Sequence, residues 1–387
     1  MMKSYSYSAD TIIHMGMEKT KDLPELLQSL QIGSSIILVS DPGVVKAGFV
    51  EPIESNLREH HYEVTRFDSI SQNPRDTECY KGAQIFRDIQ ADAVVAIGGG
   101  SAMDTGKAIA LFGPNGGTVA EYTEGQRDYQ NVAPIICIPT TSGTGAEVTR
   151  SSVITEESTH RKMTLKSESL RPTMAVLDPT LTFTVPPSIT ATTGVDALVH
   201  AIEGYTCKVT NPISQALGAR AMVIIVSALP KAYQDGQNEQ ARFDMLEGSL
   251  LAGLCFGSTD VAAVHCLAEA LGGLYDTPHG VANAVFLPHV LKFNAAENMD
   301  IHARISRYMS FSKESDSDEA AVQKLVVGIE EFTSNIDIPK LRELPGVRRE
   351  DFKKIVELAV QNGSTPSNVR TITSEDYMRI LTEAYEA

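Results

Sequence analysis

The chain has 387 residues, 42% of them hydrophobic, and a formal net charge of −16, and this composition is typical of a soluble globular protein. The length fits two domains better than one. The negative charge argues against nucleic acid or an anionic membrane surface as a partner, because both repel an acidic protein.

Cysteine usage and apolar runs indicate a cytoplasmic protein. The five cysteines are scattered, and no Cys-x-x-Cys pair occurs, which is typical of reduced thiols rather than of a disulfide framework. The opening residues MMKSYSYSAD lack the apolar core of a signal peptide. No stretch approaches 18 uncharged apolar residues, so we expect no membrane span.

The first half of the chain alternates β-rich runs with helical stretches. Strands are predicted over residues 34–41, 62–67, 91–100 and 134–139, and helices over 44–61, 76–90 and 101–112. This alternation predicts a parallel sheet covered by helices, with a ligand at the carboxyl ends of the strands. Glycine-rich turns stand at two of those ends.

The pattern changes at Pro186-Pro187, where a proline pair interrupts the chain. Beyond it, long amphipathic stretches dominate, among them residues 189–206, 214–234, 243–258 and 374–387. We therefore predict a Rossmann-like α/β domain over residues 1–185 and an all-helical domain over residues 186–387.

Two loops at predicted strand ends have the composition of a phosphate site. The first is Gly98, Gly99, Gly100 and Ser101. Glycines there let a phosphate approach backbone N–H groups at a helix N-terminus. This turn is neither GxGxxG nor a P-loop, and by itself it fits a tight structural turn equally well. The second loop, residues 139–145, adds hydroxyl groups, and the two loops together favour a phosphate or dinucleotide site.

Asp41 closes the first predicted strand. A carboxylate at a strand end can accept hydrogen bonds from a ribose diol, and it would repel a 2′-phosphate. Alternatively, Asp41-Pro42-Gly43 is simply a turn that starts a helix. The residues alone leave both interpretations open.

Four residues of the second half suit a divalent metal ion. Asp196 and His200 stand at i and i+4 of a predicted helix, so both side chains leave one face. His265 and His279 would complete an N₃O ligand set, which suits Fe²⁺, Zn²⁺ or Mn²⁺. Each histidine alone is equally well explained by a structural role. His289 stands about 15 Å further along the helix predicted to begin near His279, so we expect it to be structural.

At these motifs the sequence resembles the iron-containing (group III) alcohol dehydrogenases, over essentially the whole chain. The resemblance rests on AIGGGSAMDTGKA, PTTSGTGAEVT, ATTGVDALVHAIEGY and TPHGVANAVFLPHV. It implies a dinucleotide-binding α/β domain and a helical domain, the architecture shared with dehydroquinate synthase, with the active site in the cleft between them. It also implies a catalytic divalent metal, most often iron and sometimes zinc or another ion. Its ligands would be Asp196, His200, His265 and His279.

The resemblance also implies which residues contact the cofactor. They are Asn73, Gly98, Gly99, Gly100, Ser101, Thr140, Thr141, Thr144 and Lys162. Asp41 matches a position where relatives that prefer NAD carry aspartate, so we predict NAD rather than NADP. The implied reaction is hydride transfer between the nicotinamide and a small alcohol or aldehyde, in a homodimer or larger homo-oligomer.

Two positions depart from the family pattern. Where the family usually carries a second histidine four residues after the first, this chain has Glu269. Glu269 is interpreted as a proton-relay or pocket residue, as a carboxylate that selects cationic or polyhydroxylated substrates, or as a structural hydrogen-bonding group; a fifth metal ligand is a further alternative. Near the C-terminus, Asn368-Val369-Arg370 replaces Asn-Pro-Arg, which we interpret as local loop variation.

Three alternative functions share this architecture. They are a glycerol-dehydrogenase-like enzyme, a dehydroquinate-synthase-like lyase, and a non-catalytic binding protein. The lyase needs a basic pocket for a phosphorylated acid, whereas the segments around the candidate ligands are poor in Lys and Arg. A binding protein predicts a broken ligand set, whereas all four positions are filled.

Overall fold

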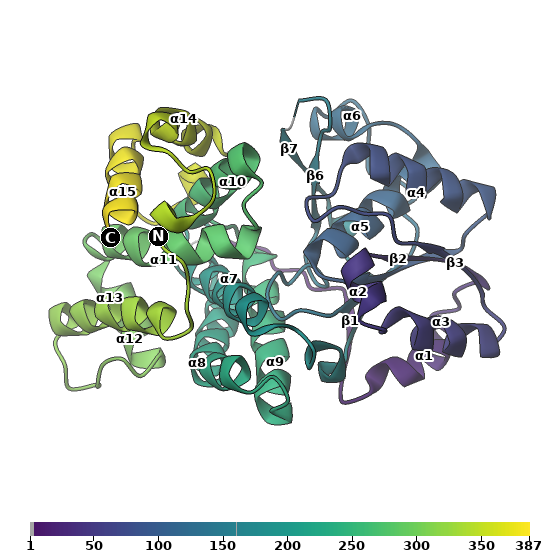
Figure 1. Cartoon of the computed structure of the whole chain (residues 1–387), viewed down its shortest axis with the longest axis horizontal. Coiled ribbons are helices and arrows are strands. Elements are labelled where there is room, and N and C mark those ends of the chain that lie inside the picture. Colours follow the sequence, from purple (N-terminus) through teal and green to yellow (C-terminus); the bar gives the residue numbers. More distant parts are fainter. Residues whose placement is uncertain (1–3, 160) are drawn as a thin grey trace. The chain divides into compact units, whose positions relative to one another are not determined.

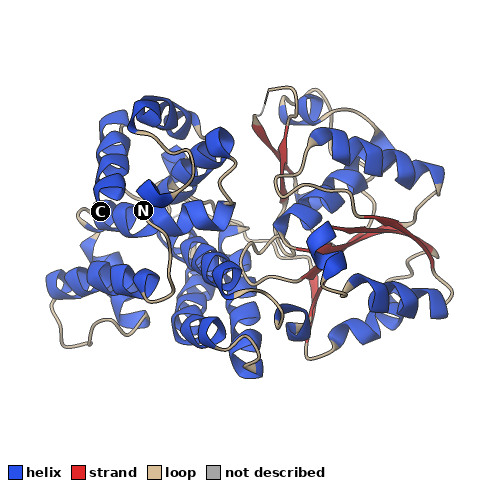
Figure 2. Cartoon of the chain, in the orientation of Figure 1, coloured by secondary structure: helices blue, strands red, loops and turns tan. Residues whose placement is uncertain are grey.

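The computed structural model describes residues 4–159 and 161–387, which form two compact units. The α/β unit is Ala9–Val185, and the helical unit is Pro186–Ala387 together with the segment that ends at Ser8. Figure 2 shows the strands within the first unit and only helices and loops in the second.

Residues 4–8 belong to the helical unit rather than to the α/β unit that follows them in sequence. The Tyr7 hydroxyl donates to the Leu254 carbonyl (3.4 Å), and the Ser258 hydroxyl donates to the Ser8 carbonyl (2.9 Å). These hydrogen bonds join positions about 250 residues apart, and nothing in the local sequence pattern indicates them.

The α/β unit is built on a six-stranded, fully parallel sheet (Figure 1). In spatial order the strands are β1 (Ile12–Met15), β8 (Met174–Leu177), β5 (Ile135–Pro139), β4 (Ala93–Gly98), β2 (Ser35–Ser40) and β3 (Glu63–Phe67). The chain continues from β2 to β3 on one side, whereas β4 and β5 lie on the other. The strand order therefore reverses at β2 and β4, and open parallel sheets bind ligands at the carboxyl ends of such a pair.

Helices cover both faces of the sheet. On one face, α1 (Leu23–Ser29) and α3 (Val50–Glu59) pack against β2 residues such as Ile36; on the other, α4 (Asp76–Asp88) and α5 (Gly100–Asn115) pack against residues such as Ile37. Successive side chains of a strand point to opposite faces. The unbroken apolar run of β2 thus follows from burial on both sides.

The remaining elements of this unit are short. They are α2 (Pro42–Lys46), α6 (Val119–Thr123), the 3₁₀ turns η1 (Lys19–Asp22), η2 (Glu168–Leu170) and η3 (Pro179–Thr182), and an antiparallel hairpin of β6 (Ser151–Thr155) and β7 (Lys162–Lys166).

Two of these elements differ from the sequence expectation. The single helix predicted over residues 44–61 is two helices, α2 and α3, because Gly48 adopts φ +81° and ends the first. The β6–β7 hairpin was not predicted at all. Its strands are short, and only one face of β7 is apolar, with Met163 and Leu165 buried.

The helical unit contains the long helices predicted from amphipathic spacing, and several others. They are α7 (Pro187–Thr206), α8 (Pro212–Gln234), α9 (Glu239–Phe256), α10 (Ala263–Tyr275), α11 (His279–Ala295), α12 (Met299–Tyr308), α13 (Asp318–Ser334), α14 (Phe352–Gln361) and α15 (Ser374–Glu386), with η4 (Leu341–Glu343), η5 (Arg349–Asp351) and η6 (Thr365–Ser367). Proline at the first helical position of α7 and α8 leaves no N–H there to satisfy.

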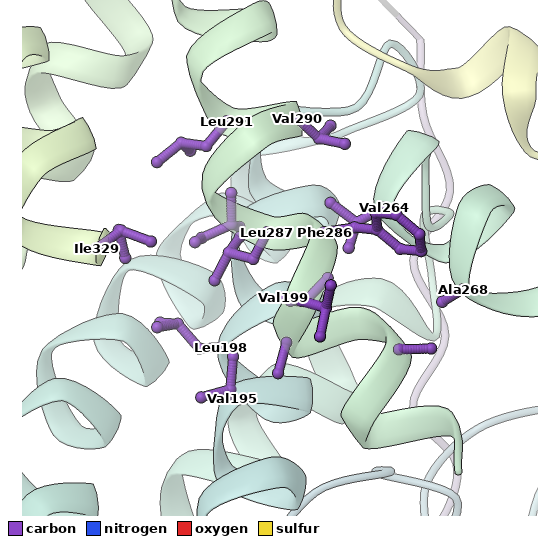
Figure 3. Close-up of a cluster of buried hydrophobic side chains, with 14 of the residues drawn as sticks. Val195, Leu198, Val199, Val264, Ala268, Phe286, Leu287, Val290, Leu291 and Ile329 are labelled. Carbon is purple, nitrogen blue, oxygen red and sulfur yellow. The ribbon is translucent and has the colours of Figure 1, made fainter. Parts of the chain in front are cut away.

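The core of the helical unit gathers around α7, α10 and α11 (Figure 3). Val195, Leu198 and Val199 of α7 face Phe286 and Leu287 of α11 in this cluster. The polar residues of α7 and α11 that matter for function are therefore held by helices whose other faces are fixed in a close-packed core.

Helix α8 is long and apolar enough to cross a membrane, with a mean hydropathy of 1.5. Length and composition alone do not distinguish a membrane span from a core helix. Here α8 packs along both α7 and α9, and residues such as Met222, Ile225 and Leu229 belong to the hydrophobic core. We therefore interpret α8 as a core helix.

The segment Asn368-Val369-Arg370 contacts α11 through the side chains of Asn368 and Arg370. Asn368 is buried and exchanges side-chain hydrogen bonds with Asn294, at 2.8 and 3.1 Å. Arg370 donates to the Phe293 carbonyl (2.9 Å) and lies over its ring, 4.0 Å from the centroid. Asn368 and Arg370 make these contacts with Val369 between them, so the valine does not prevent the segment from docking.

Candidate metal centre and cofactor loops

Four side chains converge in the helical unit: Asp196, His200, His265 and His279. One ligand atom from each, a carboxylate oxygen or an imidazole nitrogen, lies within 4.8 Å of all the others. Asp196 Oδ1 is 4.0 Å from His265 Nε2 and 3.8 Å from His279 Nε2. The His279 side chain is 34% exposed, and the other three residues are buried. The structure therefore gathers the four residues that the sequence motifs singled out.

Three helices position these side chains. Asp196 and His200 lie one turn apart in α7, His265 lies in the first turn of α10, and His279 is the first residue of α11. The start of α11 lies directly on α7, because a Cβ at Gly280 would be 2.8 Å from the Thr192 carbonyl oxygen. Any larger residue at 280 would push His279 away from the cluster.

Glu203, which the sequence motifs did not single out, holds α10 and His265 in place. Its buried carboxylate accepts hydrogen bonds from the backbone N–H groups of Ala262 (2.7 Å) and Val264 (2.8 Å). It also lies 2.7 Å from His265 Nδ1. A carboxylate is stabilised by the unpaired N–H groups at a helix N-terminus. Glu203 therefore caps α10 from α7 and orients the first imidazole of α10.

This contact sets which ring nitrogen of neutral His265 carries the proton. Because Glu203 accepts a hydrogen bond at Nδ1, the proton of neutral His265 resides there and Nε2 keeps its lone pair. Nε2 is buried, and among the described residues it has no hydrogen-bond partner. A buried acceptor without a partner is costly in free energy unless something satisfies it. A divalent cation would do so, and the donor set of three imidazoles and one carboxylate fits Fe²⁺, Zn²⁺ or Mn²⁺.

Asn283 is a second residue that the motifs did not single out. It lies one turn after His279 in α11, and its side-chain amide donates to Asp196 Oδ1 (2.6 Å) and lies 3.0 Å from His279 Nε2. The sequence spacing from the candidate ligands could have indicated both Glu203 and Asn283. Glu203 stands seven positions after Asp196 and Asn283 four after His279, so each shares a helix face with a candidate ligand.

The electrostatics of the cluster keep Asp196 anionic. Burial by itself would raise the pKa of the Asp196 carboxyl, but the three imidazoles and Asn283 hold this pKa below its ordinary value. Burial would likewise lower the pKa of His265, whereas the Glu203 carboxylate raises it. Both carboxylates therefore stabilise positive charge within the cluster.

Glu269 and His289 lie outside the cluster of four. Glu269 follows His265 by one turn of α10, and its Oε2 accepts a 2.6 Å hydrogen bond from the Asn362 side chain. His289 lies within α11, where burial lowers the pKa of its imidazole.

The glycine turn and Asp41 meet at the carboxyl ends of β2 and β4. Asp41 Oδ1 accepts hydrogen bonds from the N–H groups of Gly43 (2.8 Å) and Val44 (3.0 Å), so Asp41 does start a helix. Gly98 has φ +152°, and a Cβ there would lie 2.7 Å from that of Ala102 and 3.1 Å from Asp41 Oδ2. Only glycine fits this position, and its small size leaves Asp41 Oδ2 beside the turn.

The second loop lies against the first. The Thr140 N–H donates to the Gly98 carbonyl (3.0 Å), and a Cβ at Gly100 would lie 2.9 Å from Thr144 Cγ2. A Cβ at Gly99 would lie 3.5 Å from Thr141 Oγ1. The structure thus brings together both loops, with several hydroxyl groups beside a helix N-terminus.

Two other predicted cofactor residues lie in neighbouring segments. The Ser101 hydroxyl donates to the Gln72 carbonyl, which places the segment containing Asn73 beside the first loop. Lys162 begins β7; burial raises the pKa of Asp104 in α5, and the charge of Lys162 opposes part of that rise.

A buried ammonium group, that of Lys107 in α5, contacts the segment that follows the second loop. The Lys107 ammonium of α5 donates to the Ser151 carbonyl (2.8 Å) and the Thr149 hydroxyl (3.3 Å). Burial raises the pKa of Asp104 to about 6 and that of Glu147 to about 7, although Lys107 opposes both shifts. Glu147 Oε1 is buried and has no hydrogen-bond partner among the described residues.

Comparison with known proteins covers both units. The family model "Iron-containing alcohol dehydrogenase" matches residues 10–179, and "Fe-containing alcohol dehydrogenase family, C-terminal" matches residues 190–385. The chain is 38% identical to 1,3-propanediol dehydrogenase of Klebsiella pneumoniae over 356 residues, which are 91% of this chain and 92% of that protein. It is 35% identical to NAD-dependent methanol dehydrogenase of Bacillus methanolicus over 355 residues, covering 92% and 93%. A solved structure of 1,3-propanediol oxidoreductase superposes with a TM-score of 0.94 at 36% identity, covering 99% of this chain and 100% of the other.

Replacing Glu203 tests its role as a buried cap. Glu203→Ala leaves two backbone N–H groups and the His265 N–H without an acceptor. We expect the free energy of unfolding to fall by about 2–4 kcal/mol, measured by urea denaturation. The matched control is Glu330→Ala, the same substitution at an exposed position of α13, which should cost less than about 0.5 kcal/mol. A Glu203→Ala protein as stable as this control would contradict the capping role.

Glu147→Gln tests the buried carboxyl through pH. Below about pH 4.5 the folded and unfolded states both hold the proton; between this value and about 7 only the folded state does, so the stability of the wild type falls as pH rises. Gln carries no charge at any pH. We expect the variant to match the wild type in free energy of unfolding at pH 5 and to exceed it at pH 8 by on the order of 2 kcal/mol, measured by urea denaturation at each pH. A difference that does not change with pH, as expected for the exposed control Glu124→Gln, would refute the shift.

Proposed function

The chain belongs to the iron-containing alcohol dehydrogenase family, and we propose that it transfers hydride between NAD and a small alcohol or aldehyde at a divalent metal ion. The metal ligands in this proposal are Asp196, His200, His265 and His279. The observation that carries it is the convergence of their four ligand atoms within 4.8 Å, with the buried Nε2 of His265 left for a ligand.

The chemistry divides between the bound groups and the chain. A divalent ion at these ligands supplies Lewis acidity, and the nicotinamide supplies the hydride acceptor or donor. Glu203 fixes the tautomer and ring orientation of His265, as outer-shell carboxylates do for metal-ligating histidines. Asn283 orients the Asp196 carboxylate through its 2.6 Å hydrogen bond.

Fe²⁺ is the ion we propose first, because the family is named for iron. Zn²⁺ and Mn²⁺ suit the same ligands.

The α/β unit, Ala9–Val185, is the NAD-binding domain in this proposal. Its contacts to the cofactor come from Asn73, Gly98, Gly99, Gly100, Ser101, Thr140, Thr141, Thr144 and Lys162. The glycine turn at the N-terminus of α5 is suited to receive a pyrophosphate. This position agrees with the reversal of strand order between β2 and β4.

Asp41 favours NAD over NADP in this proposal. Its Oδ1 is engaged by the start of α2, whereas Oδ2 lies beside Gly98 and accepts no other hydrogen bond among the described residues. Oδ2 can accept from a ribose hydroxyl, and its charge would repel a 2′-phosphate. A relative is named NAD-dependent methanol dehydrogenase, which supports the same choice.

We also propose that the protein is cytoplasmic and a homodimer or larger homo-oligomer. All five cysteines are buried and free, as in a reducing compartment. Light scattering on purified protein checks the assembly, and a monomer at micromolar concentration would refute it.

Metal removal tests the proposed centre. We expect chelation to abolish the NADH signal at 340 nm with small primary alcohols, and Fe²⁺, Zn²⁺ or Mn²⁺ to restore it. His265→Ala should lower metal content at least about tenfold, because it removes one of four ligands, whereas the exposed His60→Ala should not. Full activity in the metal-free protein would refute the proposal.

Replacement of Asp41 tests the choice of cofactor. In Asp41→Ser the hydroxyl still caps α2 while the charge is lost. We expect the ratio of kcat/KM for NAD to that for NADP to fall by about tenfold or more, because repulsion of the 2′-phosphate disappears. Asp88→Ser, an exposed carboxylate at the end of α4, is the control. A wild-type preference for NADP would overturn the assignment.

A further inference from the structure

Glu269 is a carboxylate without a cationic partner. It lies in α10 one turn after His265 and on the same side of the helix, and it is partly buried. Within residues 4–159 and 161–387, its one hydrogen bond comes from the Asn362 side chain to Oε2, and it forms no ion pair. Partial burial of an unpaired charge costs free energy, so a cationic ligand would stabilise this half-buried carboxylate.

The surroundings of Glu269 do not neutralise it. Helices α7 and α10 and the segment 362–368 contain no Lys or Arg. The neighbouring helices α11 and α14 carry Lys292, Lys353 and Lys354, but these side chains are exposed, and in the part of the chain that the structure describes none forms an ion pair with Glu269. The same segment is held at its other end by a second carboxylate, since the hydroxyls of Ser364 and Ser367 donate to Asp260 at 3.0 and 2.7 Å. Neutral amide and hydroxyl groups thus fix both carboxylates in place and leave their charge uncompensated.

We propose that Glu269 is a specificity-determining residue that makes this site favour short primary alcohols with an ammonium group at the far end. The proposal rests on the dehydrogenase function above and names its substrate class. Four residues of helix separate Glu269 from His265 by about 6 Å along the axis, the length of a three- or four-carbon chain. An ammonium group would supply the missing cation and donate to Oε1, whereas a carboxylate at that end would be repelled.

Other roles of Glu269 predict different behaviour. A purely structural role depends on the hydrogen bond with Asn362, and a diol-binding role depends on a hydrogen-bond acceptor; Gln preserves both, because its amide oxygen also accepts. A proton relay would affect all alcohols alike. Only selection by charge changes the ranking of substrates that differ in charge alone.

The experiment compares wild type, Glu269→Gln and Asn362→Ala on three alcohols of similar size: 3-aminopropan-1-ol, butan-1-ol and 3-hydroxypropanoate. We expect the kcat/KM ratio of the amino alcohol to butanol to fall about tenfold or more in Glu269→Gln, and 3-hydroxypropanoate to gain relative to butanol. Asn362→Ala removes the hydrogen bond and keeps the charge, so its ratio should stay within about threefold of wild type. Metal content and Tm of each variant establish that the fold is intact.

A binding measurement gives a readout independent of turnover. Calorimetric titration of the metal-loaded protein with 3-aminopropan-1-ol, in the absence of NAD, should show a Kd that rises about tenfold in Glu269→Gln. Unchanged ratios and unchanged Kd would overturn the proposal, as would an equal loss on all three alcohols. A wild type that oxidises none of them with NAD refutes the proposed function instead, and the calorimetric Kd then decides the charge selection by itself.

Discussion

The Glu203 carboxylate is the contact on which the candidate metal centre depends. It joins α7 to the start of α10 through two backbone N–H groups and orients His265 at the same time. Because a carboxylate stabilises a helix N-terminus electrostatically, one side chain determines where α10 begins and which nitrogen of its imidazole stays available. Gly280 does the corresponding work for α11 by letting it contact the α7 backbone. The four ligand atoms converge because both junctions are close and rigid.

The two candidate cofactor loops are positioned by backbone conformation and a backbone hydrogen bond rather than by a charged side chain. Gly98 takes a conformation with positive φ and leaves Asp41 beside the turn, while the Thr140 N–H ties the second loop to the first. Lys107 of α5 is buried near Asp104 and Glu147, whose pKa values are raised by burial, and it donates to the Ser151 carbonyl. Buried charges are retained at a cost in free energy.

Glu269 stands where the sequence resemblance leads us to expect a second histidine. The carboxylate lies outside the donor set of the candidate metal centre and forms no ion pair among the described residues, so it changes the charge near the centre without changing that donor set. Substrate choice can therefore change through one position of α10 while Glu203, His265 and the packing of α7 stay as they are. When the residue that selects the substrate differs from the residues that hold the candidate metal ligands, one fold can serve many substrates.

The sequence by itself determined the elements whose signals are local. Helical spacing placed Asp196 with His200, and strand–turn–helix patterns located two glycine- and hydroxyl-rich loops at strand ends, because periodicity and turn chemistry act over a few residues. Tertiary structure alone decided that Glu203 meets His265, 62 residues away, and that Asn362 meets Glu269, 93 residues away. It also decided that residues 4–8 join the helical unit. Such contacts depend on how distant helices pack against one another, and no short-range pattern in the chain records that.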